Sequence, residues 1–385
     1  MVAGPKVTSL AVTEFEYEMK DMGADYNGFN IVYQKGSAAK RRMVVLQIFT
    51  DQGITGETVT SSVEVSTAPT WARYLIGKNA LEREKLYSDV KRALRQVARL
   101  GIAAMDNALW DIAGKHYNAP IWQLLGGHIK PLPVYASTTH GDDNGGLDSP
   151  EAYADFAVRC KGMGYPAFKI HGWGGSQVAR EVANIAAVRK AVGPNMVLMI
   201  DPACELTTWA DAWTVGRACD DARFFWLEDP YKDGGISQFG HRKLRQLIRT
   251  PILQTEHVRS LEPHVDFAIA EATDLVRGDV SYDGVTGVMK LAHACEGLGI
   301  DIEMHGAGPL QRHLMTSIRN TNYYEAALVH PKTGGTFAPI YADYKDSLDM
   351  IDKNGCVYAP EGPGVGVQLD WDYIKQHKTG GVEYK

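Results

Sequence analysis

Three short apolar segments of this chain each run into an acidic residue: residues 197–202 (VLMIDP), 224–230 (FFWLEDP) and 251–257 (PILQTEH). The acids follow one another at intervals of 27 and 28 residues, the length of a strand plus a helix, and are Asp201, Glu228 and Glu256. A single acid after a strand is more often a helix cap or a solvated charge. Three in the same register predict carboxylates that meet at one rim of a barrel, where oxygen ligands suit Mg²⁺.

Residues 131–348 show the pattern of a barrel. Strand-like apolar runs alternate with longer helix-like stretches, as expected of a parallel sheet with crossover helices. Eight such runs are present, the number that closes a barrel; they begin at Leu132, Ala167, Val197, Phe224, Ile252, Leu275, Asp301 and Tyr323. The sequence therefore predicts an α/β fold, a (β/α)7–8 TIM-like barrel, as the catalytic domain.

The two ends of the chain differ from this pattern. Residues 1–130 combine alternating segments with helical stretches, which indicates an α+β capping domain. Residues 349–385 return to short strand and turn signals and cannot complete a domain alone, so we expect them to pack back on the capping domain. A chain of 385 residues has room for a barrel and such an accessory domain.

Composition excludes several classes of protein. The formal net charge of −6 lacks the basic excess that nucleic acid or an anionic membrane surface favours. No run of 18 apolar residues and no signal-peptide pattern is evident. The five cysteines lack C-x-x-C spacing, which indicates reduced thiols rather than a disulfide framework or a zinc site. We therefore expect a cytoplasmic protein without nucleic-acid or membrane partners.

Several motifs in order along the chain carry a family resemblance. They are DNALWDIAGKHYNAPIWQLLGG (106–127), FKIHG (168–172), the three acids, RGDVSYDGVTG (277–287), EMHGAGP (303–309) and PEGPGVGV (360–367). With these motifs the chain resembles the enolase superfamily, in its mandelate racemase-like subgroup. The resemblance implies that Asp201, Glu228 and Glu256 bind Mg²⁺, which holds the carboxylate of a small-molecule substrate and stabilises the enediolate formed when the α-proton leaves. It also implies self-association, commonly as a dimer or octamer.

Two candidate bases lie on the second barrel strand. Lys169 and His171 are two residues apart, so their side chains point to the same face of the strand. Racemases of this family have a second lysine where this chain has His171, so either residue could take the proton. Lys169 is favoured, although a buried lysine paired with a ligand carboxylate is the structural alternative.

Polar residues at the ends of later strands complete the predicted site. Asp279 and His305 are 26 residues apart, one strand–helix unit, and fit a His–Asp dyad that moves a proton. The resemblance places Glu325 beside the substrate carboxylate, with a structural ion pair as the alternative. Asp229 and His257, each next to a metal-ligand acid, are expected to point outward.

A loop over residues 15–35 is expected to act as a mobile specificity loop. It is rich in glycine and polar aromatics, which suits binding of hydroxyl groups. Its candidate substrate-binding residues are Tyr17, Lys20, Tyr26 and Asn30, with Asn27 beside them. The basic run at residues 40–42 is interpreted as a solvated strand face without a role.

These features favour one reaction among several. We expect Mg²⁺-dependent dehydration of a sugar acid, an aldonate or aldarate, to a 2-keto-3-deoxy acid, with His305 protonating the departing hydroxyl. The first alternatives are a racemase or epimerase of a 2-hydroxy acid and a cycloisomerase of a sugar-acid lactone or anhydro sugar acid. A barrel that binds metal without catalysis is the remaining alternative.

Overall fold

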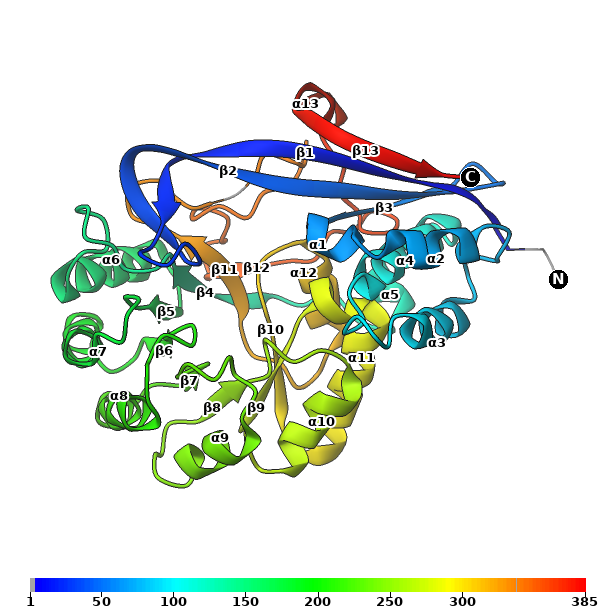
Figure 1. Ribbon diagram of the computed structural model, residues 1–385. Helices are drawn as coiled ribbons and strands as arrows, with labels where there is room; N and C mark the ends of the chain where they lie inside the picture. Colours follow the sequence, from blue (N-terminus) through cyan, green and yellow to red (C-terminus); the bar gives the residue numbers. More distant parts are fainter. Residues whose placement is uncertain (1–3, 337) are drawn as a thin grey trace.

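The structure is a computed structural model that describes residues 4–336 and 338–385. A parallel sheet forms a barrel, and a four-stranded antiparallel sheet lies across one end of it (Figure 1). The predicted α/β fold, a TIM-like barrel beneath a capping α+β part, is confirmed.

Eight parallel strands form the barrel, and each coincides with one of the apolar runs of the sequence. Their order is β10-β9-β8-β7-β6-β5-β4-β11, so strands that are neighbours in the chain are neighbours in the sheet, and β11 returns beside β4. The strands are β4 (Leu132–Thr138), β5 (Ala167–His171), β6 (Val197–Asp201), β7 (Trp226–Glu228), β8 (Ile252–Gln254), β9 (Leu275–Gly278), β10 (Asp301–Met304) and β11 (Tyr324–Val329).

Contacts outside the regular ladder join the two ends of this sheet, β10 and β11. The backbone N–H of Ile302 donates to the carbonyl of Asn320 at 2.9 Å. The side-chain amide of Asn322 donates to the buried carboxylate of Glu303 at 2.5 Å. The barrel is therefore closed partly by side chains at this seam.

Seven helices cover the outside of the barrel, and their ends carry the capping signals of the sequence. Ser149 accepts from the N–H of Ala152, Pro150 begins α6, and Gly164 ends it at φ 105°, a conformation that favours glycine. The helices are α6 (Pro150–Met163), α7 (Val178–Val192), α8 (Trp209–Ala222), α9 (Gln238–Arg245), α10 (Leu261–Ile269), α11 (Val280–Leu298) and α12 (Pro309–Ser317).

The capping part is a sheet with short helices on one side. The strands pair in the order β13-β1-β2-β3, all antiparallel, and are β1 (Val7–Ala24), β2 (Ile31–Thr50), β3 (Thr55–Thr60) and β13 (Lys378–Tyr384). The helices are α1 (Ser62–Val65), α2 (Ala68–Leu75), α3 (Arg83–Ala93), α4 (Ile102–His116) and α5 (Ile121–Leu124). Apart from α5, whose Ile121 packs in the core of the barrel, these elements enclose a second apolar core.

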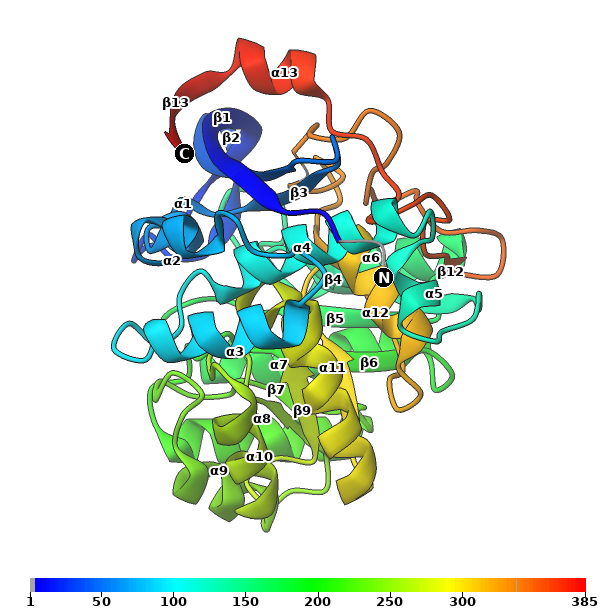
Figure 2. The same ribbon diagram turned by 90° about the vertical axis from the view of Figure 1, so that its right-hand side faces the viewer.

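Helix α4 joins the cap to the barrel. It is buried over most of its length and lies between β3 and α11 (Figure 2). The Asn107 amide donates to the Val280 carbonyl at 3.0 Å and its oxygen accepts from the Val285 N–H at 3.1 Å. The Asp106 carboxylate accepts from the N–H and hydroxyl of Thr286, both at 2.7 Å. These bonds position the start of α11, which directly follows Asp279.

The prediction of a loop over residues 15–35 is wrong in its extent. Most of that segment belongs to β1 and β2, and only the turn at residues 25–30, here called the hairpin tip, connects them. Buried side chains recur along β1, and β1 pairs with β2 over almost its whole length, which the polar composition concealed.

The last residues contact both parts of the molecule. Strand β12 (Cys356–Val357) pairs with β4 of the barrel, whereas β13 pairs with β1 of the cap after the short helix α13 (Trp371–Gln376). The domain boundaries at 130/131 and 348/349 stay predictions. Within the described residues, none of the helices combines the length and apolar character required to cross a membrane.

Candidate active site

The three predicted metal ligands lie together at the carboxyl-terminal rim of the barrel. Asp201 ends β6, Glu228 ends β7, and Glu256 follows β8 by two residues. One carboxylate oxygen of each lies within 4.8 Å of the others. The acids are nearly evenly spaced along the chain, one strand–helix unit apart. They lie close together in space because parallel strands end at the same rim.

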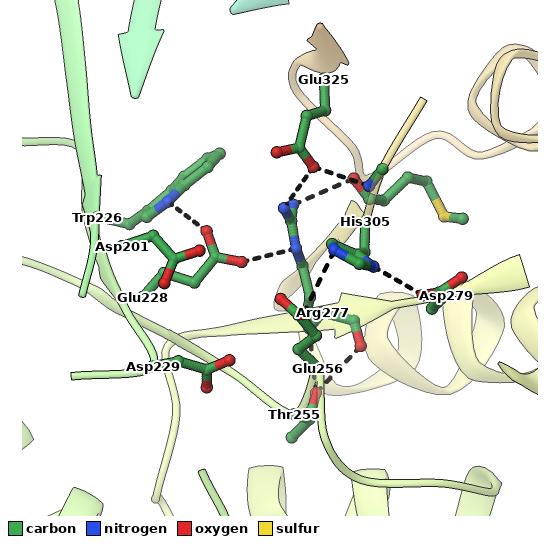
Figure 3. A network of polar contacts seen from close by, with 12 residues as sticks. Asp201, Trp226, Glu228, Asp229, Thr255, Glu256, Arg277, Asp279, His305 and Glu325 are labelled. Atoms are coloured by element: carbon green, nitrogen blue, oxygen red, sulfur yellow. Dashed lines mark hydrogen bonds and ion pairs between the residues drawn. The ribbon is translucent and has the colours of Figure 1, made fainter. Parts of the chain in front are cut away.

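A buried arginine that sequence reasoning overlooked lies between Glu228 and Glu325 (Figure 3). Arg277, on β9, is 1% exposed. Its Nε lies 2.8 Å from Glu228 Oε1 and its Nη2 lies 2.7 Å from Glu325 Oε2. Its position two residues before Asp279 was the available signal, since alternate strand residues share a face. Arg277 therefore joins a predicted metal ligand to a predicted substrate ligand.

Lys169 and His171 both reach the acid cluster from β5, as their two-residue spacing predicts. Lys169 Nζ lies 2.9 Å from Glu228, 3.2 Å from Glu325 and 3.3 Å from Asp201. Burial opposes its charged form, but Glu228 and Glu325 outweigh burial and raise the pKa of Lys169 well above its usual value. His171 Nε2 lies 3.0 Å from Asp201.

His305 and Asp279 form a close pair on the other side of the acids. His305 Nδ1 lies 2.7 Å from Asp279 Oδ2, and Nε2 lies 3.3 Å from Glu256 Oε1. Burial alone lowers the pKa of His305, but the carboxylates of Glu256 and Asp279 outweigh it and raise that pKa to about 10. Asp279 is also the N-cap of α11, so the helix end holds it in place.

Glu325 faces the interior from β11. Besides Arg277 and Lys169, it accepts a hydrogen bond from the backbone N–H of Gly306 at 2.8 Å. This contact ties β11 to the residue after His305. Glu325 therefore forms the structural ion pairs that were the alternative interpretation of this residue. A role of Glu325 in binding the substrate carboxylate stays a prediction.

A cavity of about 460 Å³ opens beside the dyad, between the barrel and the cap. Asp279 and His305 line it from the barrel, and Thr60 and Ser61 line it from the end of β3. Tyr344 adds a polar aromatic wall. The volume is in the range of small-molecule sites.

The predicted specificity residues have other partners. The Tyr26 hydroxyl and the side-chain amides of Asn27 and Asn30 each donate to Glu205, all at 3.1 Å. Glu205, 6% exposed, lies in the loop after β6 and also accepts from the Gly175 N–H. The sequence around Glu205 did not indicate this role, because its hydrogen-bond partners lie 175 to 179 residues away along the chain.

The other two predicted substrate-binding residues, Tyr17 and Lys20, lie on β1 rather than on a loop. Tyr17 is buried, and its hydroxyl lies 3.5 Å from the Thr336 carbonyl. Lys20 is exposed. Of the basic run, Arg42 forms an exposed ion pair with Glu16, as a solvated face predicts.

The acid cluster fits a hard dication. Three carboxylates supply oxygen ligands of the kind that Mg²⁺ takes. Burial raises the pKa of Glu228 despite the opposing charges of Arg277 and Lys169, and the neighbouring acids Asp201 and Glu256 raise it further. Such mutual repulsion among buried acids is what a bound dication relieves.

Comparison with known families assigns the chain. The family model for the enolase C-terminal domain-like fold matches residues 152–373, and that for the mandelate racemase / muconate lactonizing enzyme N-terminal domain matches residues 29–126. The chain belongs to the mandelate racemase / muconate lactonizing enzyme family of the enolase superfamily. The resemblance predicted from the sequence motifs is therefore confirmed.

Relatives in this family have several activities. D-galactarolactone cycloisomerase of Agrobacterium fabrum is 28% identical, over 88% of this chain and 92% of that enzyme. D-gluconate dehydratase of Thermoproteus tenax is 26% identical, over 72% of this chain and 56% of that enzyme. A crystal structure of D-glucarate dehydratase from Agrobacterium tumefaciens, complexed with magnesium, has a TM-score of 0.88 at 26% identity and covers 97% of this chain and 99% of its own.

Proposed function

We propose that this enzyme dehydrates a sugar acid, an aldonate or aldarate, to a 2-keto-3-deoxy acid in a Mg²⁺-dependent reaction. The observation that carries the proposal is the placement of three carboxylates between Lys169 and His171 on one side and His305 on the other. Dehydration needs a base beside the α-carbon and an acid beside the departing hydroxyl, and this arrangement has a candidate for each.

Asp201, Glu228 and Glu256 would hold the metal. When bound, Mg²⁺ would supply positive charge to the substrate carboxylate, which gains a second negative charge as the α-proton leaves. Arg277 forms a buried ion pair with Glu228, so the chain fixes at least one ligand through an oppositely charged side chain.

The base would come from β5. Lys169 Nζ and His171 Nε2 both lie close to Asp201, at 3.3 and 3.0 Å, and so flank the same ligand. His171 Nδ1 is occupied by the Thr138 carbonyl at 2.6 Å, which fixes the ring and leaves Nε2 for proton transfer. The assignment between Lys169 and His171 is left to experiment.

The acid would be His305. Asp279 holds its Nδ1, which orients the ring and directs Nε2 toward Glu256 of the acid cluster. The dyad lines the cavity, so a substrate in that cavity would present its β-hydroxyl to the imidazole. Proton delivery there turns the leaving hydroxide into water.

A screen of four- to six-carbon sugar acids with Mg²⁺ tests the proposal. We expect a keto acid, detected as its semicarbazone, with at least one substrate, and none after chelation of the metal. His305→Asn should abolish keto-acid formation, whereas Arg42→Gln on the solvated face of β2 should leave it unchanged. A complete screen without any keto acid would show that the reaction is not a dehydration.

The same screen in D₂O separates the rival reactions. An epimerase would return substrate or its epimer with deuterium at the α-carbon and no keto acid. A cycloisomerase, favoured by the 28% identity with the D-galactarolactone enzyme over most of both chains, would consume a lactone without releasing water. Exchange retained in Lys169→Met but lost in His171→Asn would assign the base to His171, and the reverse would assign it to Lys169.

Other expectations from the sequence stay predictions. They are a small-molecule carboxylate substrate, no nucleic-acid or membrane partner, self-association as a dimer or octamer, and a cytoplasmic location.

A further inference from the structure

A second group of potential metal ligands lies next to the acid cluster but has different chemistry. Cys204, Asp229 and His257 each offer one ligand atom, and these three atoms lie within 4.8 Å of one another. Each follows one of the three predicted Mg²⁺ ligands along the chain: Cys204 comes after β6, Asp229 after β7 and His257 after β8. In Figure 3, Asp229 lies apart from the network around Arg277.

The carboxylate of Asp229 is buried, and its charged partner is His257. Its side chain is 1% exposed, and Oδ2 lies 3.2 Å from His257 Nε2. Among the residues that the structure describes, neither oxygen receives a well-aligned hydrogen bond. A buried carboxylate in this condition is costly unless a cation or donor satisfies it.

The side-chain amide of Gln254 lies near the Asp229 carboxylate, beside Gly235. Gln254 is fully buried, and within the described chain both polar atoms of its side chain lack a hydrogen-bond partner. A methyl group placed on Gly235 would lie 2.8 Å from Asp229 Oδ1, 3.1 Å from Gln254 Oε1 and 3.4 Å from the His257 ring. These groups therefore pack closely around Gly235, where any side chain would collide with the Asp229 carboxylate.

We propose that Cys204, Asp229 and His257 form a second metal site, which takes a borderline-soft dication such as Zn²⁺. Thiolate and imidazole are ligands that select Zn²⁺ over Mg²⁺, whereas the all-carboxylate cluster suits Mg²⁺. Binding forms metal bonds to the Cys204 sulfur, a His257 ring nitrogen and an Asp229 oxygen, and it releases to solvent the thiol proton of Cys204 and the proton of His257 that faces Asp229. His257, whose side chain is 41% exposed, gives the ion access from solvent.

The site would be structural and would join three loops of the rim. The backbone N–H of Cys204 already donates to the Asp229 carbonyl at 2.7 Å, so two of the loops touch without metal. A bound ion would add His257 and hold the residues beside Asp201, Glu228 and Glu256. The cysteine spacing along the chain did not predict this, because the three ligands meet only through the barrel.

Cobalt substitution tests the site directly. Co²⁺ bound to a thiolate gives an intense charge-transfer absorption in the near ultraviolet that carboxylate ligands do not give. We expect this band when the full-length protein is titrated with Co²⁺, with about two ions bound in total. Cys204→Ser should lose the band and retain about one ion. Zn²⁺ should displace the Co²⁺ responsible for the band, whereas excess Mg²⁺ should not.

Matched variants separate this site from the acid cluster. Cys356→Ser removes another partly exposed cysteine and should leave the band unchanged. Asp201→Asn should weaken the Mg²⁺ site and abolish turnover but keep the band. His257→Asn, at an exposed position, should lose the band without unfolding the protein. The proposal is overturned if the wild type gives no thiolate band, or if the band survives Cys204→Ser or disappears with Cys356→Ser.

Discussion

At the scale of single residues, Arg277 is the group on which the candidate site most depends. Its guanidinium is buried between Glu228 and Glu325, at 2.8 and 2.7 Å. Arg277→Met would leave two buried carboxylates with less compensating charge, and removing one partner of a buried pair costs about 3–5 kcal/mol. We expect this loss in urea unfolding, together with weaker Mg²⁺ binding by calorimetry. Arg277→Lys, which keeps charge but not the two-sided geometry, should recover part of the stability and little of the metal affinity.

Glu181 supplies a residue-scale prediction about pH. Its carboxylate is buried and accepts the Trp173 N–H at 2.7 Å, yet burial prevails and raises its pKa from 4.5 to about 7. The folded state therefore binds more protons than the unfolded state between these values, and Glu181 lowers stability as pH rises through that window. Glu181→Gln keeps an acceptor for Trp173 and should flatten the dependence. The measurement is the difference in unfolding free energy between wild type and variant at pH 5 and pH 8; equal slopes would contradict the prediction.

At the scale of elements, the hairpin tip is attached to the barrel through the Glu205 carboxylate, while the Asp25 carboxylate accepts hydrogen bonds within the tip. Glu205 receives hydrogen bonds from Tyr26, Asn27 and Asn30, so the turn between β1 and β2 is attached to the loop after β6. Glu205→Ala should free residues 25–30 while the two strands persist. We expect faster limited proteolysis at the tip and a higher KM for any substrate that the hairpin covers. Glu18→Gln, an exposed glutamate on β1, is the control and should change neither.

At the scale of the whole molecule, α4 contacts both the cap and the barrel, and we expect it to couple their unfolding. Asn107 satisfies a backbone acceptor and a backbone donor at the start of α11, both in buried surroundings. Asn107→Ala leaves both groups unpaired, at about 1–3 kcal/mol each. We expect a lower urea midpoint and separate transitions for cap and barrel. Gln123→Ala, at an exposed position of α5, is the control and should give the same urea unfolding curve as the wild type.

Local patterns were sufficient for the barrel and for the positions of the acids. Strand period, helix caps and apolar runs act over a few residues, so the eight strands and α6 could be located directly. The constant spacing of Asp201, Glu228 and Glu256 then predicts their proximity, because parallel strands present their carboxyl ends to one rim. The same reasoning paired Asp279 with His305.

The tertiary structure alone decided which charges meet across the fold. Arg277 and Glu325 are 48 residues apart, Tyr26 and Glu205 are 179 apart, and neither pair has a shared period or motif. The hairpin was mistaken for a loop because composition reports polarity, whereas its strands are stabilised by pairing with each other and with distant β13. Local sequence determined the strands and helices of the barrel, whereas the strands of the hairpin depend on pairing between segments. Partners between elements depend on how the closed barrel and its cap bring side chains together in space.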